Sequence, residues 1–269
     1  MNTPHPQQPI GIFDSGIGGL TVVKEIIRLL PNESLIYFGD TARVPYGTKS
    51  DSTIKEYSVQ DTKFLLTHNV KLIVVACNSA SSVALDEIKS RTDKPVVGVI
   101  KPGAEAAVIA SHHKRIAIIG TNATVSSRAY EHEIHKFNSE IDVAGKACPL
   151  FVPIVEEGWM DHEIAFLTAK EYLFSLKKFA YDTMILGCTH YPLLKNVIRK
   201  VVGENVTLID SGIETAKQVK NILTEMNLLN PSNQKPNRKY FVSDLPHKFK
   251  EIGEMFLGEK IERITKIDL

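Results

Sequence analysis

Cysteine is scarce in this chain of 269 residues, which contains only Cys77, Cys148 and Cys188. A small, odd number of cysteines argues against a disulfide framework. The sequence also lacks a Cys-x-x-Cys pair, so it supports neither a zinc ribbon nor a thioredoxin-type redox centre. Any function of the cysteines must therefore rest on single thiols.

An excess of one charge is also missing, because 32 Lys and Arg residues face 31 Asp and Glu residues. This balance predicts neither nucleic-acid binding nor a polybasic membrane segment. The longest apolar runs, such as residues 72–77, are too short to span a bilayer. The first nine residues lack the basic start and apolar stretch of a signal peptide. We therefore expect a cytoplasmic protein without a membrane or nucleic-acid partner.

Short β-branched runs alternate with longer amphipathic segments along the chain. Strands are predicted at residues 10–13, 35–38, 72–76, 96–99, 116–119, 183–186 and 206–209. Helices are predicted near 19–30, 51–68, 79–90, 102–112, 125–138, 161–178, 192–202 and 213–227. This alternation indicates an α/β fold with parallel strands and helices on both faces. The loops that follow such strands share one rim, where we expect the functional residues.

Two segments resemble each other across the halves of the chain. "LIVVACNSA" contains Cys77 and "TMILGCTHY" contains Cys188, and each cysteine ends an apolar run. Internal similarity of this kind favours two related α/β halves that each carry one cysteine. Buried parallel strands also resemble one another without any duplication, so both explanations stay open.

Cys77 is placed between an apolar strand and a helix that opens with Asn78 and Ser79. The N-terminus of a helix favours anions, so it is expected to stabilise a thiolate or to hold a substrate carboxylate. Cys188 has the same setting, and Thr189 and His190 follow it directly. His190 is a candidate base or electrostatic partner for that thiol. The alternative for Cys77 is a structural role in the core, and a lone histidine such as His190 is also commonly structural.

Two thiols in matching positions suit one reaction class in particular. Racemisation removes a proton from one face of a carbon atom and returns a proton to the other face. Two facing groups that exchange the roles of acid and base perform this directly. The proton on the α-carbon of an amino acid is very weakly acidic, so the reacting thiolate must be poorly solvated. Cys148 precedes a proline, lacks the strand-end setting and is predicted to be structural.

Other polar residues are expected on the same rim. The loop "FDSGIGG" offers Asp14 and Ser15, and its glycines would let the backbone approach a ligand. It does not match the dinucleotide fingerprint, and a Walker lysine is missing. Asp14 is interpreted as a ligand for a substrate ammonium, a support for Cys77 or a helix cap, whereas Asp210 is interpreted as a cap. Further candidates for substrate binding are Asp40, Arg43, Tyr46, Gly47, Asn78, Ser79, Thr121, Thr124 and Thr189.

From residue 10 to about residue 222 these motifs together resemble the glutamate racemases, cofactor-independent enzymes of bacterial cell-wall synthesis. The resemblance is carried by "GIFDSGIGGLTV", "YFGDTARVPYG", "CNSAS", "FVPIVEEG", "LGCTHYPLL" and "IDSG". It implies two α/β domains that face each other across a cleft, formed by residues 1–104 with 213–269 and by residues 105–212. Ser79 departs from the family's usual threonine but keeps the hydroxyl group.

The resemblance also implies the roles of individual residues. Cys77 and Cys188 would be the acid–base pair, Asp14 would support Cys77, and His190 would support Cys188 together with Glu156 or Glu157, of which we favour Glu157. Substrate contacts are implied at Asp14, Ser15, Tyr46, Gly47, Asn78, Ser79, Thr189 and His190. A homodimer that uses no cofactor and no metal is expected, with D-glutamate supplied to peptidoglycan.

Three other functions compete with glutamate racemisation. Aspartate racemase shares the two-cysteine design and would differ in the loops that bind the carboxylates. A cysteine amidohydrolase would use Cys188 as nucleophile and His190 as base, without any need for Cys77. A protein that only binds an amino acid would need neither thiol.

Overall fold

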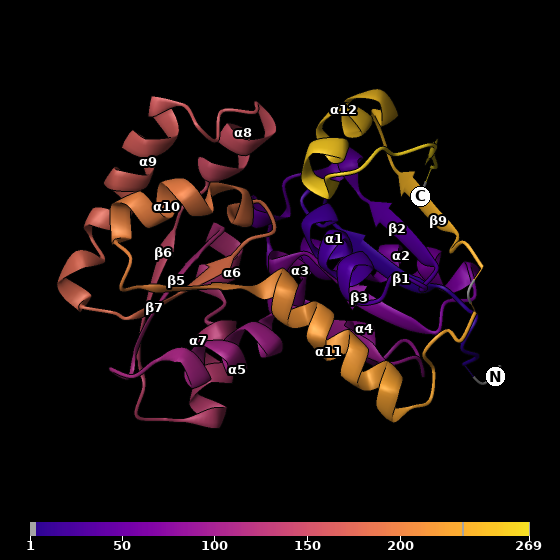
Figure 1. Cartoon of the computed structure of the whole chain (residues 1–269), viewed down its shortest axis with the longest axis horizontal. Coiled ribbons are helices and arrows are strands. Elements are labelled where there is room, and N and C mark those ends of the chain that lie inside the picture. Colours follow the sequence, from indigo (N-terminus) through magenta and orange to yellow (C-terminus); the bar gives the residue numbers. More distant parts are fainter. Residues whose placement is uncertain (1–3, 233, 269) are drawn as a thin grey trace.

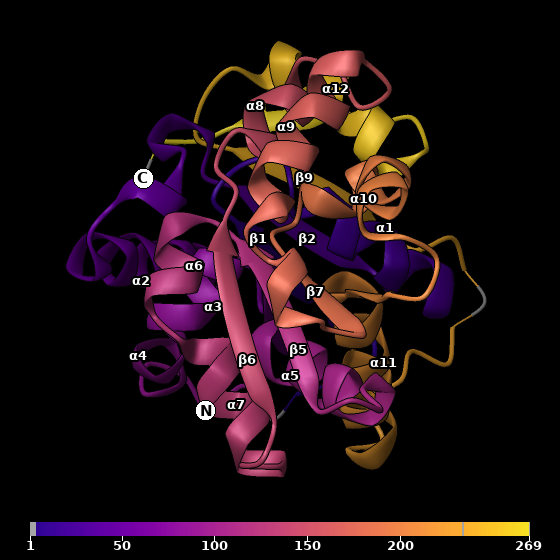
Figure 2. The same ribbon diagram turned by 90° about the vertical axis from the view of Figure 1, so that its left-hand side faces the viewer.

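The structure is a computed structural model that describes residues 4–232 and 234–268, and it contains two parallel β-sheets. The strands are β1 Ile10–Asp14, β2 Leu35–Gly39, β3 Leu72–Val75, β4 Val96–Gly98, β5 Arg115–Gly120, β6 Asp142–Ala147, β7 Thr183–Gly187, β8 Thr207–Asp210, β9 Arg238–Val242 and β10 Ile264–Lys266. One sheet has the order β10-β9-β2-β1-β3-β4 and the other has the order β6-β5-β7-β8. The two sheets form lobes that lie side by side in Figure 1, and β5–β7 lie in front of β1 and β2 in Figure 2.

Helices cover both sheets. The α-helices are α1 Leu20–Leu29, α2 Asp51–Thr67, α3 Asn78–Val83, α4 Leu85–Lys89, α5 Ile100–Ala110, α6 Asn122–Ser126, α7 Ala129–Phe137, α8 Phe151–Glu156, α9 Glu163–Phe174, α10 Lys195–Val202, α11 Ser211–Glu225 and α12 Pro246–Leu257. Short 3-10 helices are η1 Thr41–Arg43, η2 Tyr46–Thr48, η3 Lys177–Phe179 and η4 Tyr191–Leu194. None of the helices in the described part of the chain is long and apolar enough to cross a membrane.

The predicted α/β fold with two parallel sheets is confirmed, and every predicted strand is present. All residues of β1, β2, β3 and β7 are buried, because helices cover both faces of their sheets. Strand β6 and helix α8 were not predicted. Strand β6 has the sequence DVAGKA and lies at the edge of its sheet, half exposed, so it lacks the apolar run that marks the inner strands.

The chain passes between the lobes twice. Helix α5 leads from β4 to β5, and α11 leads from β8 back to β9, so the C-terminal strands complete the first sheet. The predicted division at residues 104 and 105 falls inside α5, which packs on α11 and also on α7, β7 and β8. The strands follow the predicted division, whereas the domain boundaries themselves stay a prediction.

The C-terminal ends of the parallel strands bring the predicted rim residues together. Asp14 ends β1, Cys77 follows the end of β3 by two residues, and Cys188 directly follows β7. Asp210 caps α11 as predicted, since its carboxylate accepts hydrogen bonds from the N–H groups of Gly212 and Ile213. The rim formed by the C-terminal strand ends of one sheet therefore faces the corresponding rim of the other sheet.

Candidate active site

Both strand-end cysteines line a single pocket between the two sheets. It has a volume of about 50 Å³, far below the several hundred Å³ of typical ligand sites. It is lined by Ser15, Gly16, Ile17, Val44, Pro45, Tyr46, Gly47, Cys77, Asn78, Ser79, Thr121, Val152, Glu156, Cys188, Thr189 and His190. A pocket this narrow leaves room for only a few water molecules, so groups inside it are poorly solvated.

Cys77 is the N-cap residue of α3 and its side chain is nearly inaccessible to solvent. Its sulfur lies 3.6 Å from the Ser15 hydroxyl. Burial raises the pKa of the thiol to about 12, and the Asp14 carboxylate adds to the effect. Hydrogen bonds from the N–H of Ala80 and from Ser15 act in the opposite direction but are weaker. The N–H groups at the start of α3 thus act in the predicted direction, but desolvation outweighs them and the pKa of Cys77 is raised overall.

Cys188 has a different partner. Its sulfur lies 3.8 Å from Nδ1 of His190, and Nε2 of the same ring lies 3.0 Å from the carboxylate of Glu156. Burial lowers the pKa of His190, but the contacts with Cys188 and Glu156 more than offset this and raise it to about 10. The imidazole is therefore protonated at neutral pH and places a positive charge beside Cys188.

Glu156, and not Glu157, is the carboxylate that contacts His190, so our preference for Glu157 is wrong. Glu156 is the last residue of α8 and lines the pocket, whereas Glu157 follows the helix and is exposed. Successive residues of a helix point in directions about 100° apart, so only one of two adjacent side chains can face the histidine. The sequence does not reveal α8, and for that reason it left the choice open.

Asp14 lies behind the pocket rather than on its surface. The side chain is buried, one oxygen accepts a hydrogen bond from the N–H of Gly16, and the other lies 3.5 Å from the Thr189 hydroxyl. Burial raises the pKa of Asp14. It does not cap α1, whose N-cap residue is Gly19. Its carboxylate thus holds the loop after β1 and reaches towards the second lobe, without a place in the pocket lining.

The glycine-rich loop approaches the other lobe closely. A Cβ atom on Gly18 would lie 2.1 Å from the Thr189 hydroxyl and 2.6 Å from the His190 ring, which no side chain permits. We expected the loop glycines to let the backbone approach a ligand. For Gly18 the structure corrects this, because the close neighbour is the loop that carries Cys188.

Asn78 supplies a hydrogen-bond donor that has no partner among the described residues. Its side-chain carbonyl accepts a hydrogen bond of 2.7 Å from the Tyr130 hydroxyl, and Nδ2 is buried without a partner. A buried and unsatisfied N–H group is costly, so native structures seldom retain one without a reason. Because Asn78 lines the pocket, a substrate carboxylate can accept this donor. Tyr130 was not predicted, since it comes from α7 of the other lobe.

Three hydroxyl groups form a chain across the pocket. Ser79 lies 2.9 Å from the hydroxyl of Thr121, which lies 3.0 Å from that of Thr124. Ser79 and Thr121 line the pocket, whereas Thr124 is buried behind them. A hydroxyl at position 79 is sufficient for this chain, so the serine in place of threonine keeps the link between the lobes.

The loop after β2 contributes to the pocket through Tyr46 and Gly47, as predicted. Arg43 and Asp40 do not line it, and this part of the prediction is wrong. Both side chains point into a buried cluster behind the loop, where the guanidinium pairs with Asp40 at 2.6 Å and with Asp61 at 3.1 Å. The phenolic hydroxyl of Tyr46 also belongs to this cluster.

Cys148 is fully buried and does not line the pocket. Burial raises its pKa to about 12, and the Tyr191 hydroxyl donates a 2.8 Å hydrogen bond to its backbone carbonyl. Its surroundings are those of a residue of the core, which agrees with the predicted structural role.

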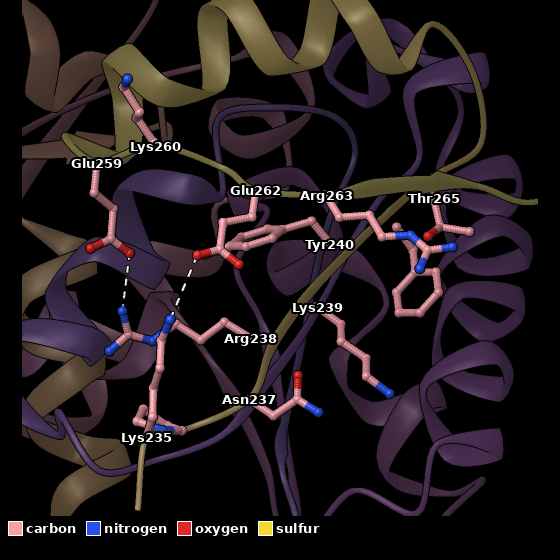
Figure 3. A pocket seen from close by; sticks show the side chains of 12 residues that line it. Lys235, Asn237, Arg238, Lys239, Tyr240, Glu259, Lys260, Glu262, Arg263 and Thr265 are labelled. Carbon is pink, nitrogen blue, oxygen red and sulfur yellow. Dashed lines mark hydrogen bonds and ion pairs between the residues drawn. The ribbon is translucent and has the colours of Figure 1, made fainter.

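A larger hollow of about 870 Å³ lies elsewhere, between β9 and the segment that leads to β10 (Figure 3). Its lining carries more basic than acidic side chains, and two ion pairs cross it, Arg238 with Glu259 and Lys235 with Glu262. It contains neither a thiol nor a histidine. Although this hollow is larger, it lacks the side chains that the chemistry needs. The small pocket that holds both thiols is the better candidate for the catalytic site.

Known proteins resemble this chain over almost its entire length. A glutamate racemase of Geobacter metallireducens is 52% identical over 264 residues, which cover 98% of each chain. The crystal structure of a glutamate racemase from Bacillus anthracis superposes with a TM-score of 0.95 at 39% identity, covering 98% of this chain and 99% of that one. The structure of the Francisella tularensis glutamate racemase in complex with D-glutamate gives a TM-score of 0.92 at 42% identity and covers 98% of both chains.

The family model for Asp/Glu/hydantoin racemases matches residues 10–219, which include both strand-end cysteines and every residue of the pocket lining. With this match, and with half of its residues identical to those of a full-length relative, the chain belongs to the Asp/Glu/hydantoin racemase family and, within it, to the glutamate racemases.

Proposed function

We propose that this protein interconverts L-glutamate and D-glutamate without a cofactor, with Cys77 and Cys188 as the acid–base pair. The observation that supports this best is that two thiols, one from each sheet, line the same narrow and poorly solvated pocket. The named relatives act as the second support, since each of them is a glutamate racemase.

In the proposed reaction, one cysteine as thiolate removes the proton from the α-carbon of the substrate. The other cysteine as thiol donates a proton to the opposite face, and the inverted enantiomer leaves. The exclusion of water keeps the thiolate reactive, because it has no hydration shell to lose when it approaches the carbon atom. After each turnover the two protonation states are reversed, which prepares the enzyme for the opposite direction.

The substrate is proposed to be held by the polar groups of the pocket. The free Nδ2 donor of Asn78, the hydroxyl groups of Ser79 and Thr189 and the backbone of Tyr46 and Gly47 are suited to the two carboxylates. D-Glutamate made in this way would serve peptidoglycan synthesis. The homodimer and the cytoplasmic location stay predictions.

The test is chiral chromatography of purified protein incubated separately with L-glutamate and with L-aspartate. We expect conversion of glutamate to its enantiomer and little or no conversion of aspartate. Interconversion of aspartate alone would point to an aspartate racemase, and amide cleavage without inversion would point to the cysteine hydrolase.

The same incubation in D₂O tests the two-base mechanism. Two bases on opposite faces place solvent deuterium at the α-carbon, chiefly in the newly formed D-enantiomer, which mass spectrometry detects. Transfer of the substrate's own proton to the product would support a single base and contradict the proposal.

A further inference from the structure

A buried cluster of charged and polar side chains lies directly behind the loop that carries Tyr46 and Gly47. Asp40 and Asp61 are fully buried, and Arg43 lies between them. Tyr46 connects this cluster to the pocket, because it lines the pocket while its phenolic oxygen faces both carboxylates. The cluster takes no part in the proton transfers described above.

Asp40 receives a donor at each of its oxygen atoms. Oδ2 accepts from Nε of Arg43 at 2.6 Å and from the Tyr46 hydroxyl, and Oδ1 accepts from the Ser243 hydroxyl at 2.9 Å. The Ser243 oxygen also accepts a 2.8 Å hydrogen bond from the N–H of Ala42, and its own proton is available for Asp40. Three donors are what an ionised carboxylate requires.

Among the described residues, only Arg43 gives Asp61 such a donor. Its Oδ1 lies 3.1 Å from Nη2 of Arg43, and its Oδ2 lies 2.9 Å from the phenolic oxygen of Tyr46. A phenol has a single proton, so it cannot donate to Asp40 and to Asp61 at the same time. Two ionised carboxylates would leave the contact between Tyr46 and Asp61 without a proton, as a repulsive approach of two oxygen atoms in a buried site.

We propose that Asp61 is a neutral carboxylic acid that donates its proton to the Tyr46 hydroxyl, which in turn donates to ionised Asp40, and that this relay positions the Tyr46–Gly47 loop for the substrate. The charges then balance, with one anion at Asp40 and one cation at Arg43. Burial and the nearby Asp40 carboxylate raise the pKa of Asp61 well above its ordinary value, which agrees with this assignment.

The relay affects the shape of the pocket because the Tyr46–Gly47 loop is packed between two neighbours. A Cβ atom on Gly47 would lie 2.6 Å from Cβ of Thr121 in the other lobe, so the loop has no space to shift forward. Behind it, the end of β9 holds the preceding residues. The Thr41 hydroxyl donates to the carbonyl of Asp244 at 2.5 Å and accepts from its N–H at 2.7 Å.

Ser243 and Asp244 lie beyond the residues that the family model matches. Asp40, Asp61 and Ser243 are thus proposed as positioning residues, and the segment that follows β9 contributes through the contact of Ser243 with Asp40. This inference rests on the proposed function for its kinetic test, but the protonation states can be tested without it.

The experiment compares Asp61→Asn with Asp40→Asn and Asp61→Leu. An asparagine amide imitates a protonated aspartate, since it donates to Tyr46 and accepts from Arg43. We expect Asp61→Asn to keep the KM for glutamate within about threefold of the wild-type value. Asp40→Asn removes the carboxylate that accepts from Arg43, Tyr46 and Ser243, and Asp61→Leu removes the relay, so each should raise KM by about tenfold or more.

The division between KM and kcat separates positioning from a loss of folded protein. A merely destabilised enzyme shows a lower apparent kcat at unchanged KM, whereas a displaced loop raises KM. Equal damage from the two asparagine variants would overturn the assignment, and so would damage from Asp61→Asn with a normal Asp40→Asn. A normal KM in Asp61→Leu would overturn the positioning role.

Infrared spectroscopy tests the protonation state directly. At pH 7 the carbonyl stretching band of protonated carboxylic acids should be weaker in Asp61→Asn than in the wild-type protein. A band of unchanged intensity in Asp61→Asn would overturn the proposal whatever the enzyme catalyses. A wild-type protein that does not racemise glutamate but shows the expected bands would reject the proposed function alone.

Discussion

The Cys77 side of the pocket and the Cys188 side surround the same functional group with opposite charges. Cys77 is buried near the Asp14 carboxylate, and its pKa is raised to about 12. Cys188 lies beside His190, whose own pKa is raised to about 10 through its contacts with Cys188 and Glu156. One thiol therefore faces an anion and the other faces a cation.

This difference gives the two thiols distinct electrostatic surroundings. Cys77 rests as a thiol, because a thiolate there would be desolvated and close to a carboxylate. The His190 imidazolium can donate a hydrogen bond to a thiolate at Cys188. The proposed mechanism needs one acid and one base on opposite faces of the carbon atom, and the unequal surroundings of the two thiols suit that division of roles.

Among the variants considered, removal of either cysteine sulfur should cause the largest loss of racemase activity. Cys77→Ala and Cys188→Ala each delete one half of the acid–base pair, so we expect both to lower kcat for racemisation by about a thousandfold or more in both directions. Chiral chromatography measures the loss, and circular dichroism checks that the fold is retained. Full activity in either variant would contradict the two-base mechanism and with it the comparison of the two sides.

Loss of the carboxylate behind His190 should have the next largest effect. Glu156→Gln removes the anion that holds the imidazolium, so we expect kcat/KM to fall by about 10- to 100-fold. Glu157→Gln is the matched control, because it makes the same chemical change one residue away on an exposed side chain. A larger loss in Glu157→Gln than in Glu156→Gln would return the role to Glu157.

The pH dependence of Glu156→Gln sharpens the comparison further. His190 is protonated below its pKa of about 10, and Glu156 is one of the causes that raise this pKa above 6.5. Without that carboxylate the imidazolium loses its proton at lower pH. The alkaline limb of the plot of kcat/KM against pH should therefore move to lower pH, whereas in Cys148→Ala it should stay in place. An unchanged alkaline limb in Glu156→Gln would mean that His190 does not control it.

Replacement of Ser15 should have the smallest effect of the series. Its hydroxyl lies 3.6 Å from the sulfur of Cys77 and is one of several groups that lower the pKa of that thiol. Ser15→Ala removes this contact, so the Cys77 thiolate should become harder to form and kcat should fall by about two- to fivefold in the direction that uses Cys77 as base. Initial rates at saturating concentrations of each enantiomer measure the two kcat values, and an equal fall of kcat in both directions would contradict the asymmetry.

The sequence by itself determined the fold class and most of the pocket lining. Parallel strands with fully apolar sequences, such as β3 and β7, place the next residues on the rim of a sheet, so Cys77 and Cys188 were identified from their position after such strands. The motifs on both sides of these cysteines were specific enough to indicate the family.

Only the tertiary structure decided which neighbours each thiol has. Glu156 contacts His190 because α8 turns it towards the pocket, and Asp14 lies near Cys77 because β1 and β3 are adjacent in the sheet. Arg43 likewise points away from the pocket and pairs with Asp61, because α2 packs behind the loop that follows β2. Charge and solvation act through space, so the protonation of a thiol depends on neighbours that are distant in the chain, and local patterns in the sequence do not contain that information.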